Sequence, residues 1–386
     1  MDSRGNRALI DFIRAKIASD GPVSFAWFME QALYHPEHGY YSSGRAKLGR
    51  SGDYFTSVSV GPTFGRLLAL QFEEIWRKLG RPDDFAIVEQ GAHNGNLAGD
   101  VLGALATSSP ESLDRIRYRI IEPFPLFRQE QQRALTPFLR RVEWINSLNE
   151  LPPSTGIFFS NELVDAMPVH LFRSREDAPA YGLRWEEKCV DWQNGSFGLV
   201  ERPVGDPLIQ EQLSALPAVA AASEVEVNLT ALKWIDMLSE KLRRGVILTI
   251  DYGYVHQQLS AKDQSSGSLQ CRQKHQLIES PFAAVGECDI TAHVNWTAVA
   301  RQARKQGLDI VGFTDQHHFL TGVISDNPDF VERADAGGRR QLQTLLHPET
   351  MGRSFQVLAL SRGIPPDLIL SGFKFARPAQ KQLGLM

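Results

Sequence analysis

Apolar residues recur at helical spacing in the first 80 residues of the chain. Leu9, Ile13 and Ile17 lie four positions apart and predict one buried face of a helix. Two further helices are expected over residues 25–33 and 64–79, where apolar positions again repeat every three or four residues. The N-terminal region is therefore expected to be mainly helical.

Short apolar runs replace this pattern from about residue 85 onward, separated by helical stretches. Such alternation is typical of a mostly parallel α/β sheet. The runs predict seven strands, at residues 85–88, 118–121, 142–145, 156–159, 246–250, 309–313 and 355–360. Helices are expected between them, including residues 97–105, 230–242 and 294–306, the last with Thr291 as its cap.

Residues 169–222 interrupt the alternation. A β-prone run ends at Asn194-Gly195, a strong signal for a hairpin turn. We therefore expect an inserted antiparallel β subdomain here and a long polar loop over residues 260–287. The predicted division is an N-terminal helical region with a signature loop, a sheet core in two pieces, and the insertion, at 1–82, 83–168 with 223–386, and 169–222.

The composition favours a globular protein over a nucleic-acid binder, a disulfide-bonded protein or a membrane protein. The chain has 386 residues, a net charge of −4 and 42% hydrophobic residues, which fits a globular protein and gives no basic stripe for nucleic acid. The cysteines Cys189, Cys271 and Cys288 form no CxxC pair, which argues against disulfides and structural zinc. With no secretory signal and no long apolar run, we expect a cytoplasmic protein without a membrane span. The oligomeric state is not indicated.

The first candidate site follows the strand at residues 85–88. Glu89, Gly91 and Gly95 form an E-x-G-x-x-x-G turn that opens a helix. Glycines let the backbone approach a ligand, and an acid before them suits a cationic ligand such as the aminoacyl end of S-adenosylmethionine. A nicotinamide or flavin site would read G-x-G-x-x-G instead. A tight turn without a ligand is the other alternative.

Glu122 ends the next strand, where an acid typically receives the ribose hydroxyls of a nucleoside cofactor. A solvated strand-end carboxylate is the alternative. Asn146 and Ser147 follow the third strand, and by position they are candidates to lie against an adenine.

Asn161, Glu162 and Asp165 follow the fourth strand, at the sheet edge expected to be nearest a reacting methyl group. Carboxylates there can grip a cationic or amide nitrogen by charge-assisted hydrogen bonds. The alternative is a helix cap, with Asn161 at the cap and both acids in the first turn.

Together these segments resemble the MidA-type class I S-adenosylmethionine-dependent methyltransferases, which include the mitochondrial complex I assembly-factor methyltransferase. The resemblance covers nearly the whole chain and is carried by Gly39-Tyr40-Tyr41, residues 52–57, Phe64-Gly65, Glu89-x-Gly91, residues 161–169, residues 250–253 and residues 289–296.

The resemblance implies a seven-stranded, Rossmann-like methyltransferase sheet with an N-terminal helical region and a β insertion. It implies S-adenosylmethionine as methyl donor and a protein substrate methylated on arginine, with a respiratory complex I subunit as the candidate. The implied cofactor residues are Glu89, Gly91, Gly95, Glu122 and the N-terminal signature residues Gly52, Asp53, Thr56 and Ser57. Asn161, Glu162 and Asp165 are the implied catalytic residues.

The sequence departs from the family at the glycine turn, where Ala92 and His93 replace a proline and a glycine. A tyrosine expected before His275 is also missing, and the roles of His275 and His293 stay open. A non-catalytic assembly factor on the same fold is therefore an alternative, and a nicotinamide or flavin oxidoreductase is another. The paired histidines at 35/38 and 317/318 have no acidic or cysteine partner nearby in sequence, so we expect no metal site.

Overall fold

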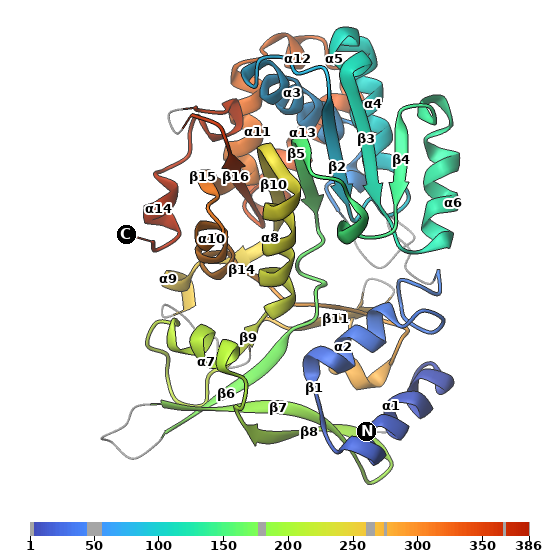
Figure 1. Ribbon diagram of the computed structural model, residues 1–386, viewed down its shortest axis with the longest axis vertical. Helices are drawn as coiled ribbons and strands as arrows, with labels where there is room; N and C mark the ends of the chain where they lie inside the picture. Colours follow the sequence, from blue (N-terminus) through green and yellow to red (C-terminus); the bar gives the residue numbers. More distant parts are fainter. Residues whose placement is uncertain are drawn as a thin grey trace. The chain divides into compact units, whose positions relative to one another are not determined.

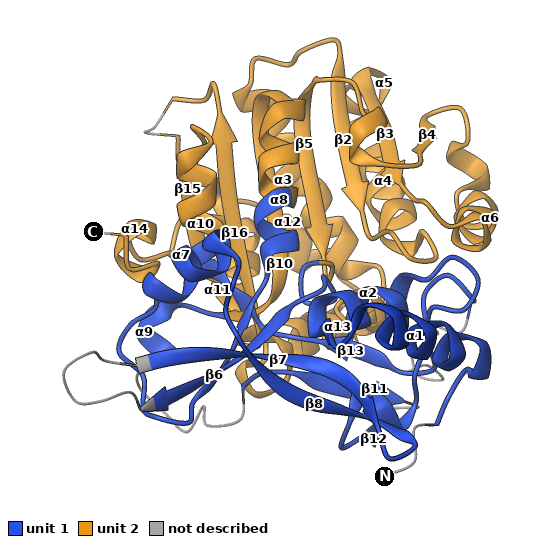
Figure 2. Cartoon of the chain, turned by 60° about the horizontal axis from the view of Figure 1, so that its bottom comes forward, with its two compact units in different colours: residues 1–54, 164–233, 254–298 blue, residues 55–163, 234–253, 299–386 orange. Residues whose placement is uncertain are grey.

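The computed structural model describes residues 4–44, 56–176, 183–259, 267–273, 276–365 and 368–385. The chain forms two compact units, each assembled from separate stretches of sequence (Figure 2). Unit 1 comprises residues 1–54, 164–233 and 254–298, and unit 2 comprises residues 55–163, 234–253 and 299–386. The division into three parts expected from the sequence stays a prediction.

Unit 2 contains the seven predicted strands in one sheet (Figure 1). From one edge to the other they are β15 (Asp309–Asp315), β16 (Phe355–Arg362), β10 (Leu242–Tyr254), β5 (Ser154–Asn161), β2 (Phe85–Gln90), β3 (Ile116–Ile121) and β4 (Val142–Ile145). The five strands from β10 to β4 are parallel, and β16 runs antiparallel to both of its neighbours. The α/β fold class predicted from the sequence is confirmed.

Helices cover both faces of this sheet because its strands are apolar on both sides. Ile87, Ile157 and Leu248 face a core shared with α3 (Thr63–Lys78), α4 (Asn96–Ser108), α11 (Gln316–Ser325) and α13 (Ala336–Leu346). Val88, Phe158 and Ile247 face the other way, against Trp234 and Leu238 of α8 (Leu229–Lys241). Unit 2 also contains α5 (Pro110–Arg115), α6 (Pro125–Ala134), α12 (Asp329–Glu332) and α14 (Ala379–Gln382), with short turns at Val58–Val60, Thr136–Phe138, Leu148–Glu150 and Pro348–Gly352.

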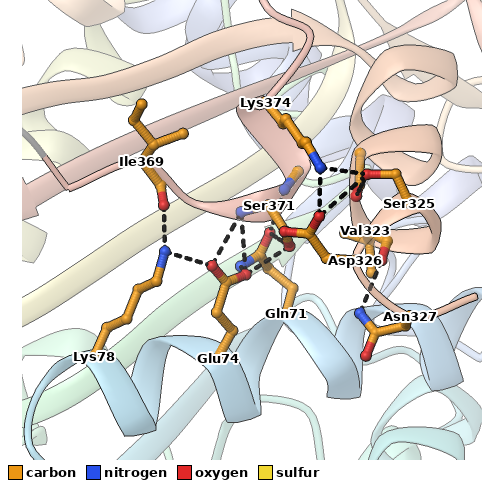
Figure 3. Close-up of polar contacts among 12 residues, drawn as sticks. Gln71, Glu74, Lys78, Val323, Ser325, Asp326, Asn327, Ile369, Ser371 and Lys374 are labelled. Atoms are coloured by element: carbon orange, nitrogen blue, oxygen red, sulfur yellow. Dashed lines mark hydrogen bonds and ion pairs between the residues drawn. The ribbon is translucent and has the colours of Figure 1, made fainter.

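A buried polar cluster fastens the C-terminal segment to α3 (Figure 3). Glu74 accepts hydrogen bonds from the backbone N–H of Ser371 at 3.1 Å and from its hydroxyl at 2.5 Å. Gln71, fully buried, accepts a bond from the Gly372 N–H at 2.9 Å. These contacts hold the turn Ser371–Phe373 against the helix that lines the core.

Unit 1 contains a five-stranded antiparallel sheet formed by β1 (Val23–Ser24), β6 (His170–Glu176), β7 (Leu183–Gln193), β8 (Ser196–Pro203) and β9 (Glu224–Val227). Asn194 and Gly195 both have positive φ, at 51° and 82°, which is the two-residue turn that matches strand twist. The predicted hairpin is confirmed. Helix α7 (Pro207–Ser214) packs Ile209 and Leu213 against Phe172 of β6.

The first two helices of unit 1 lie where the sequence places them. Leu9, Ile13 and Ile17 are buried along α1 (Arg7–Asp20). Helix α2 (Phe25–Tyr34) starts after Ser24, whose hydroxyl accepts the Trp27 N–H at 3.2 Å and so caps the first turn.

Two sequence predictions in this unit are wrong. The expected loop at residues 260–287 contains β11 (Gln270–Gln273) and β12 (Gln276–Leu277), which form a three-stranded sheet with β13 (Asp289–Thr291). Thr291 is therefore a strand residue and caps no helix. Helix α10 (Trp296–Lys305) follows β14 (Val294–Asn295), and the Asn295 side chain accepts the Ala298 N–H at 3.1 Å. The unit also contains α9 (His256–Leu259) and a short turn at Pro281–Ala283.

Candidate cofactor and active site

The strand order reverses direction between β2 and β5. From β2 the chain proceeds outward through β3 and β4, and then returns to place β5 and β10 on the opposite side. Ligands of such sheets bind beyond the carboxyl ends of the strands at this reversal. The parallel register pairs Gln90 with Ser160, so the segments that follow β2 and β5 leave the sheet side by side.

The turn after β2 takes left-handed backbone conformations. Gly91 and Gly95 have φ of 85° and 82°, and His93 adopts the same region at 44°. A Cβ at Gly91 would lie 3.3 Å from Leu163, the second residue after β5, so the two turns are in contact. The Gly95 N–H donates to the Ala92 carbonyl at 2.8 Å and closes the turn at the N-terminus of α4.

Glu89 lies at the end of β2 with 2% of its surface exposed. The Tyr118 hydroxyl of β3 donates to its carboxylate at 2.7 Å. Burial raises the pKa of Glu89 to about 7, and the hydrogen bond from Tyr118 opposes that rise. A cationic ligand nearby would favour the ionised form, so this carboxyl is suited to an ammonium group.

Glu122 directly follows β3 and is also buried. Its two oxygens accept hydrogen bonds from the Phe124 N–H at 2.9 Å and from the Gln131 amide at 2.8 Å. Burial raises the pKa of Glu122 to about 7, and these two bonds and the charge of Arg128 lower it again. The carboxyl is thus held in a fixed orientation, which a residue that binds ribose hydroxyls requires.

Helix α6 supplies further contacts to the turns after β2, β3 and β4. The Phe127 ring lies 4.8 Å from the His93 ring, centre to centre. Arg128 donates to the Asn146 side-chain oxygen at 2.8 Å and to the Glu122 carbonyl at 3.1 Å. The Ser147 carbonyl accepts the Glu150 N–H at 3.1 Å, so Asn146 and Ser147 belong to an ordered turn after β4.

The end of β5 carries buried polar atoms without partners. Within the described residues, the Ser160 hydroxyl and the Asn161 side-chain oxygen make no hydrogen bond. Buried polar groups in native proteins are almost always satisfied, so these two atoms indicate a place where a ligand binds. They lie at the strand reversal, next to the turn after β2.

Glu162 leaves β5 in a left-handed conformation, with φ of 52°. Its N–H donates to the Ile250 carbonyl at 2.9 Å, and the Asn161 amide donates to its carboxylate at 3.0 Å. The described residues between β5 and β6 contain no helix. The alternative that Asn161 caps a helix is therefore wrong, and a strained, acidic turn after a central strand favours a functional role.

Asp251 of β10 supports this turn from the neighbouring strand. It is fully buried, and one carboxylate oxygen accepts the Leu163 N–H at 3.1 Å while the other accepts the Tyr252 N–H at 2.8 Å. Asp165 belongs to unit 1, where it is buried and its carbonyl accepts the Ala292 N–H at 2.8 Å. Its expected role with Glu162 stays a prediction.

The N-terminal signature is only partly placed. Gly52, Asp53 and His275 lie outside the described residues. Thr56 and Ser57 are buried, and the Ser57 hydroxyl donates to Gln316 of α11 at 2.9 Å. Their expected contact with the cofactor stays a prediction. The His293 N–H donates to the Ser268 hydroxyl at 2.9 Å in unit 1.

These residues fit S-adenosylmethionine. Gly91 and Gly95 supply the left-handed backbone of the turn after β2, Glu89 suits an ammonium, and Glu122 suits ribose hydroxyls. The unsatisfied oxygens of Ser160 and Asn161 lie at the end of β5, which pairs with the end of β2.

Sequence reasoning missed the residues that hold the acids in place. Tyr118 lies inside β3 and Gln131 inside α6, and neither differs in pattern from an ordinary core tyrosine or a polar helix residue. The signal available for Gln131 was its position one helical turn after Phe127, on the face of α6 directed at the sheet.

Comparisons with known proteins identify the family of the chain. A family model of S-adenosyl-L-methionine-dependent methyltransferases matches residues 67–314. The mitochondrial protein arginine methyltransferase NDUFAF7 of Homo sapiens is 26% identical over 95% of this chain and 85% of its own length. Its Drosophila melanogaster homologue is also 26% identical, over 93% of this chain and 86% of its own length.

A solved structure shows the same fold with a ligand. A COG1565-superfamily protein from Burkholderia thailandensis, described as a methyl transferase and bound to S-adenosyl-homocysteine, is 30% identical and superposes with a TM-score of 0.85 over 97% of this chain and 96% of its own. The cofactor prediction of S-adenosylmethionine is confirmed, and the oxidoreductase alternative is wrong.

The prediction of a cytoplasmic location is also wrong, because the relatives in fly and human are mitochondrial proteins. Among the described residues, no helix combines the length and the apolar character needed to cross a membrane. The family model spans more than half of the chain, in agreement with the MidA-type motifs. The chain therefore belongs to the S-adenosyl-L-methionine-dependent methyltransferases.

Proposed function

We propose that this methyltransferase modifies arginine side chains of a protein substrate. Relatives that share 26% of its residues along most of its length are named protein arginine methyltransferases. The structural observation that carries the proposal is the acidic turn after β5. Glu162 is held there in a strained conformation beside the unsatisfied oxygen of Asn161, directly at the strand reversal.

This turn suits a guanidinium group. S-adenosylmethionine, when bound, supplies an electrophilic methyl group on its sulfonium. The Glu162 carboxylate can accept two N–H bonds of a guanidinium and localise the positive charge away from the reacting nitrogen. The Asn161 oxygen can accept a third N–H bond. As the nitrogen gains a methyl group it loses a proton, and the same carboxylate is placed to receive it.

Methyl transfer to arginine can be tested in an extract from cells that lack the protein. The purified enzyme is incubated with the extract and S-adenosylmethionine carrying a tritiated methyl group, and the protein fraction is hydrolysed and separated into amino acids. We expect labelled methylarginine with the wild type. Labelled methyl-lysine or a labelled small molecule in its place would contradict the arginine proposal.

The role of Glu162 is tested by Glu162→Gln. This change keeps the size of the side chain but removes the charge that grips the cation. We expect turnover to fall by about 10²-fold or more, with S-adenosylhomocysteine affinity within about threefold of the wild type. Glu240→Gln, the same change at an exposed position of α8, is the matched control and is expected to leave both quantities unchanged. Equal turnover in Glu162→Gln and the control would exclude the role.

A respiratory complex I subunit is the candidate substrate, since that partner is the one implied for the mitochondrial relatives. Tritium should then appear in a subunit of the complex and be located in an arginine-containing peptide by mass spectrometry. An enzyme that binds S-adenosylhomocysteine but labels no protein in the extract would instead favour a non-catalytic assembly factor.

A further inference from the structure

Gln131 of α6 occupies a central position between the two halves of the cofactor site. It is fully buried, although glutamine is a polar residue that is usually exposed. Its amide nitrogen donates to the His93 carbonyl at 2.7 Å and to the Glu122 carboxylate at 2.8 Å. Its amide oxygen accepts the indole N–H of Trp144 at 2.9 Å.

These contacts use both N–H donors of the amide and its oxygen, so they fix which way the amide points. A carboxylate in this position would face two acceptors, the His93 carbonyl and the Glu122 carboxylate, and would be repelled by both. A hydrocarbon side chain would remove the donor that Gln131 supplies to the His93 carbonyl and to one oxygen of Glu122. Glutamine therefore satisfies a donor requirement that other residues of its size do not.

The partners of Gln131 belong to three different segments of the chain. His93 lies in the turn after β2, Glu122 directly follows β3, and Trp144 is a residue of β4. A Cβ at Gly95 would also lie only 3.1 Å from the Gln131 backbone, so α6 and the glycine turn are closely packed. One side chain thus connects the turn expected to hold the aminoacyl end of the cofactor with the acid expected to hold its ribose.

We propose that Gln131 is a positioning residue in the cofactor site. It keeps Glu122 oriented and ionised for the ribose hydroxyls, and it fixes the position of Glu122 relative to the glycine turn. The inference rests on the assignment of Glu122 to the ribose. An ionised carboxylate accepts bonds from both ribose hydroxyls, whereas a protonated one offers weaker acceptors and a donor.

The proposed role of Gln131 should be visible in how cofactor binding depends on pH, because it acts through the titration of Glu122. The pKa of Glu122 is raised to about 7 by burial, and the Gln131 amide is one of the groups that lower it. Other charged or titratable groups around the site are Glu89 of β2, His93, Arg128 of α6, and Glu150, which accepts a bond from Asn146 at 3.0 Å. Loss of the amide should raise the pKa of Glu122 further, so that cofactor binding requires a higher pH.

The experiment is calorimetric titration of the full chain with S-adenosylhomocysteine at half-unit steps from pH 6 to pH 9. The wild type is compared with Gln131→Met, which has a similar volume and no donor, and with Gln131→Glu, which adds a second carboxyl beside Glu122. Gln132→Glu, at the exposed neighbouring position of the same helix, is the control for added charge. The quantity plotted is the ratio of wild-type to variant affinity, in which pH effects from the ligand and from unchanged groups cancel.

We expect this ratio to be about tenfold or more at pH 6.5 for both Gln131 variants and to decline toward a plateau above pH 8.5. The reason is that raising the pKa of Glu122 by one unit lowers the affinity about tenfold only at pH values where this carboxyl is protonated. Gln131→Glu should show the larger shift, and Gln132→Glu a ratio near one throughout. Trp144→Phe, which removes the indole donor to the Gln131 oxygen and keeps an aromatic ring, should show the same decline with smaller amplitude. If Gln131→Glu does not fold, Gln131→Met and Trp144→Phe decide the question.

A ratio that is constant with pH would overturn the inference, because a merely structural role weakens binding equally at every pH. A ratio of one would overturn it as well. Neither result affects the proposed methyltransferase function, whose failure would appear instead as absence of S-adenosylhomocysteine binding to the wild type.

Discussion

Replacing Glu89 by glutamine should stabilise the ligand-free protein at alkaline pH while removing its ability to bind the cofactor. Glu89 is 2% exposed, and burial raises its pKa from an ordinary value of 4.5 to about 7. Between these two values the unfolded chain releases a proton that the folded protein keeps. The folded state therefore binds more protons, and the free energy of unfolding decreases as the pH rises.

The size of this effect follows from the shift. A difference of about 2.5 pH units at 1.36 kcal/mol per unit corresponds to about 3 kcal/mol, absent below pH 4.5 and complete above pH 7. Glutamine carries no charge at any pH, and its amide oxygen can still accept the Tyr118 hydroxyl that now bonds to Glu89 at 2.7 Å. Glu89→Gln should thus equal the wild type in stability near pH 4.5 and exceed it by up to about 3 kcal/mol at pH 8.

Urea unfolding at intervals from pH 5 to pH 8 measures this difference. Glu130→Gln, the same substitution at an exposed position of α6, is the control and should follow the wild type at every pH. Saturating S-adenosylhomocysteine should stabilise the wild type by about 2.7 kcal/mol at one hundred times its dissociation constant, and should give little stabilisation to Glu89→Gln. Parallel stability curves for Glu89→Gln and the wild type would refute the argument that this carboxyl is kept protonated by burial.

Other substitutions test the turn and the C-terminal contact. Gly91→Ala should lower S-adenosylhomocysteine affinity about tenfold, because φ of 85° costs a residue with a Cβ about 1–2 kcal/mol and that atom would lie 3.3 Å from Leu163. Calorimetry measures the affinity. The control is Gly103→Ala, at a glycine inside α4 with open space around it, and it should leave the affinity unchanged. Ser371→Ala should reduce stability by about 1–3 kcal/mol in urea unfolding, because Glu74 loses a buried hydroxyl donor (Figure 3), and unchanged stability would contradict this. Asp251→Asn should weaken the turn after β5, because the Leu163 N–H loses a charged acceptor. We expect turnover to fall more than cofactor affinity, which a comparison of kcat and KM measures.

The sheet could be predicted from sequence because its strands are buried on both faces. Runs such as Phe85–Val88 are apolar at every position, which distinguishes them from the amphipathic helices between them. The small sheet containing β11 was missed for the opposite reason. Gln270, Arg272 and Gln273 are polar and surround a single buried residue, Cys271, a pattern that does not separate a short strand from a loop.

The acids of the site could be predicted because parallel strands bring their carboxyl ends to one edge of the sheet. Glu89, Glu122 and Glu162 were found in this way. The partners that orient them were not, since Gln131 and Tyr118 acquire their roles only through contacts with distant segments. Nor does spacing show that Glu162 adopts φ of 52° without a helix after it, because the same residues would make an acceptable helix start.

The interleaving of the two units has a consequence for synthesis on the ribosome. Strand β5 ends at Asn161, whereas its neighbour β10 begins only at Leu242, after four strands and two helices of other structure. At a synthesis rate of 5–20 residues per second, the edge of β5 that pairs with β10 stays unpaired for roughly 4–16 s. The exposed segment includes the apolar run Ile157-Phe158-Phe159, and unpaired apolar edges promote aggregation. Nascent chains of this protein should therefore depend on chaperone binding during that interval more than a methyltransferase without the insertion would.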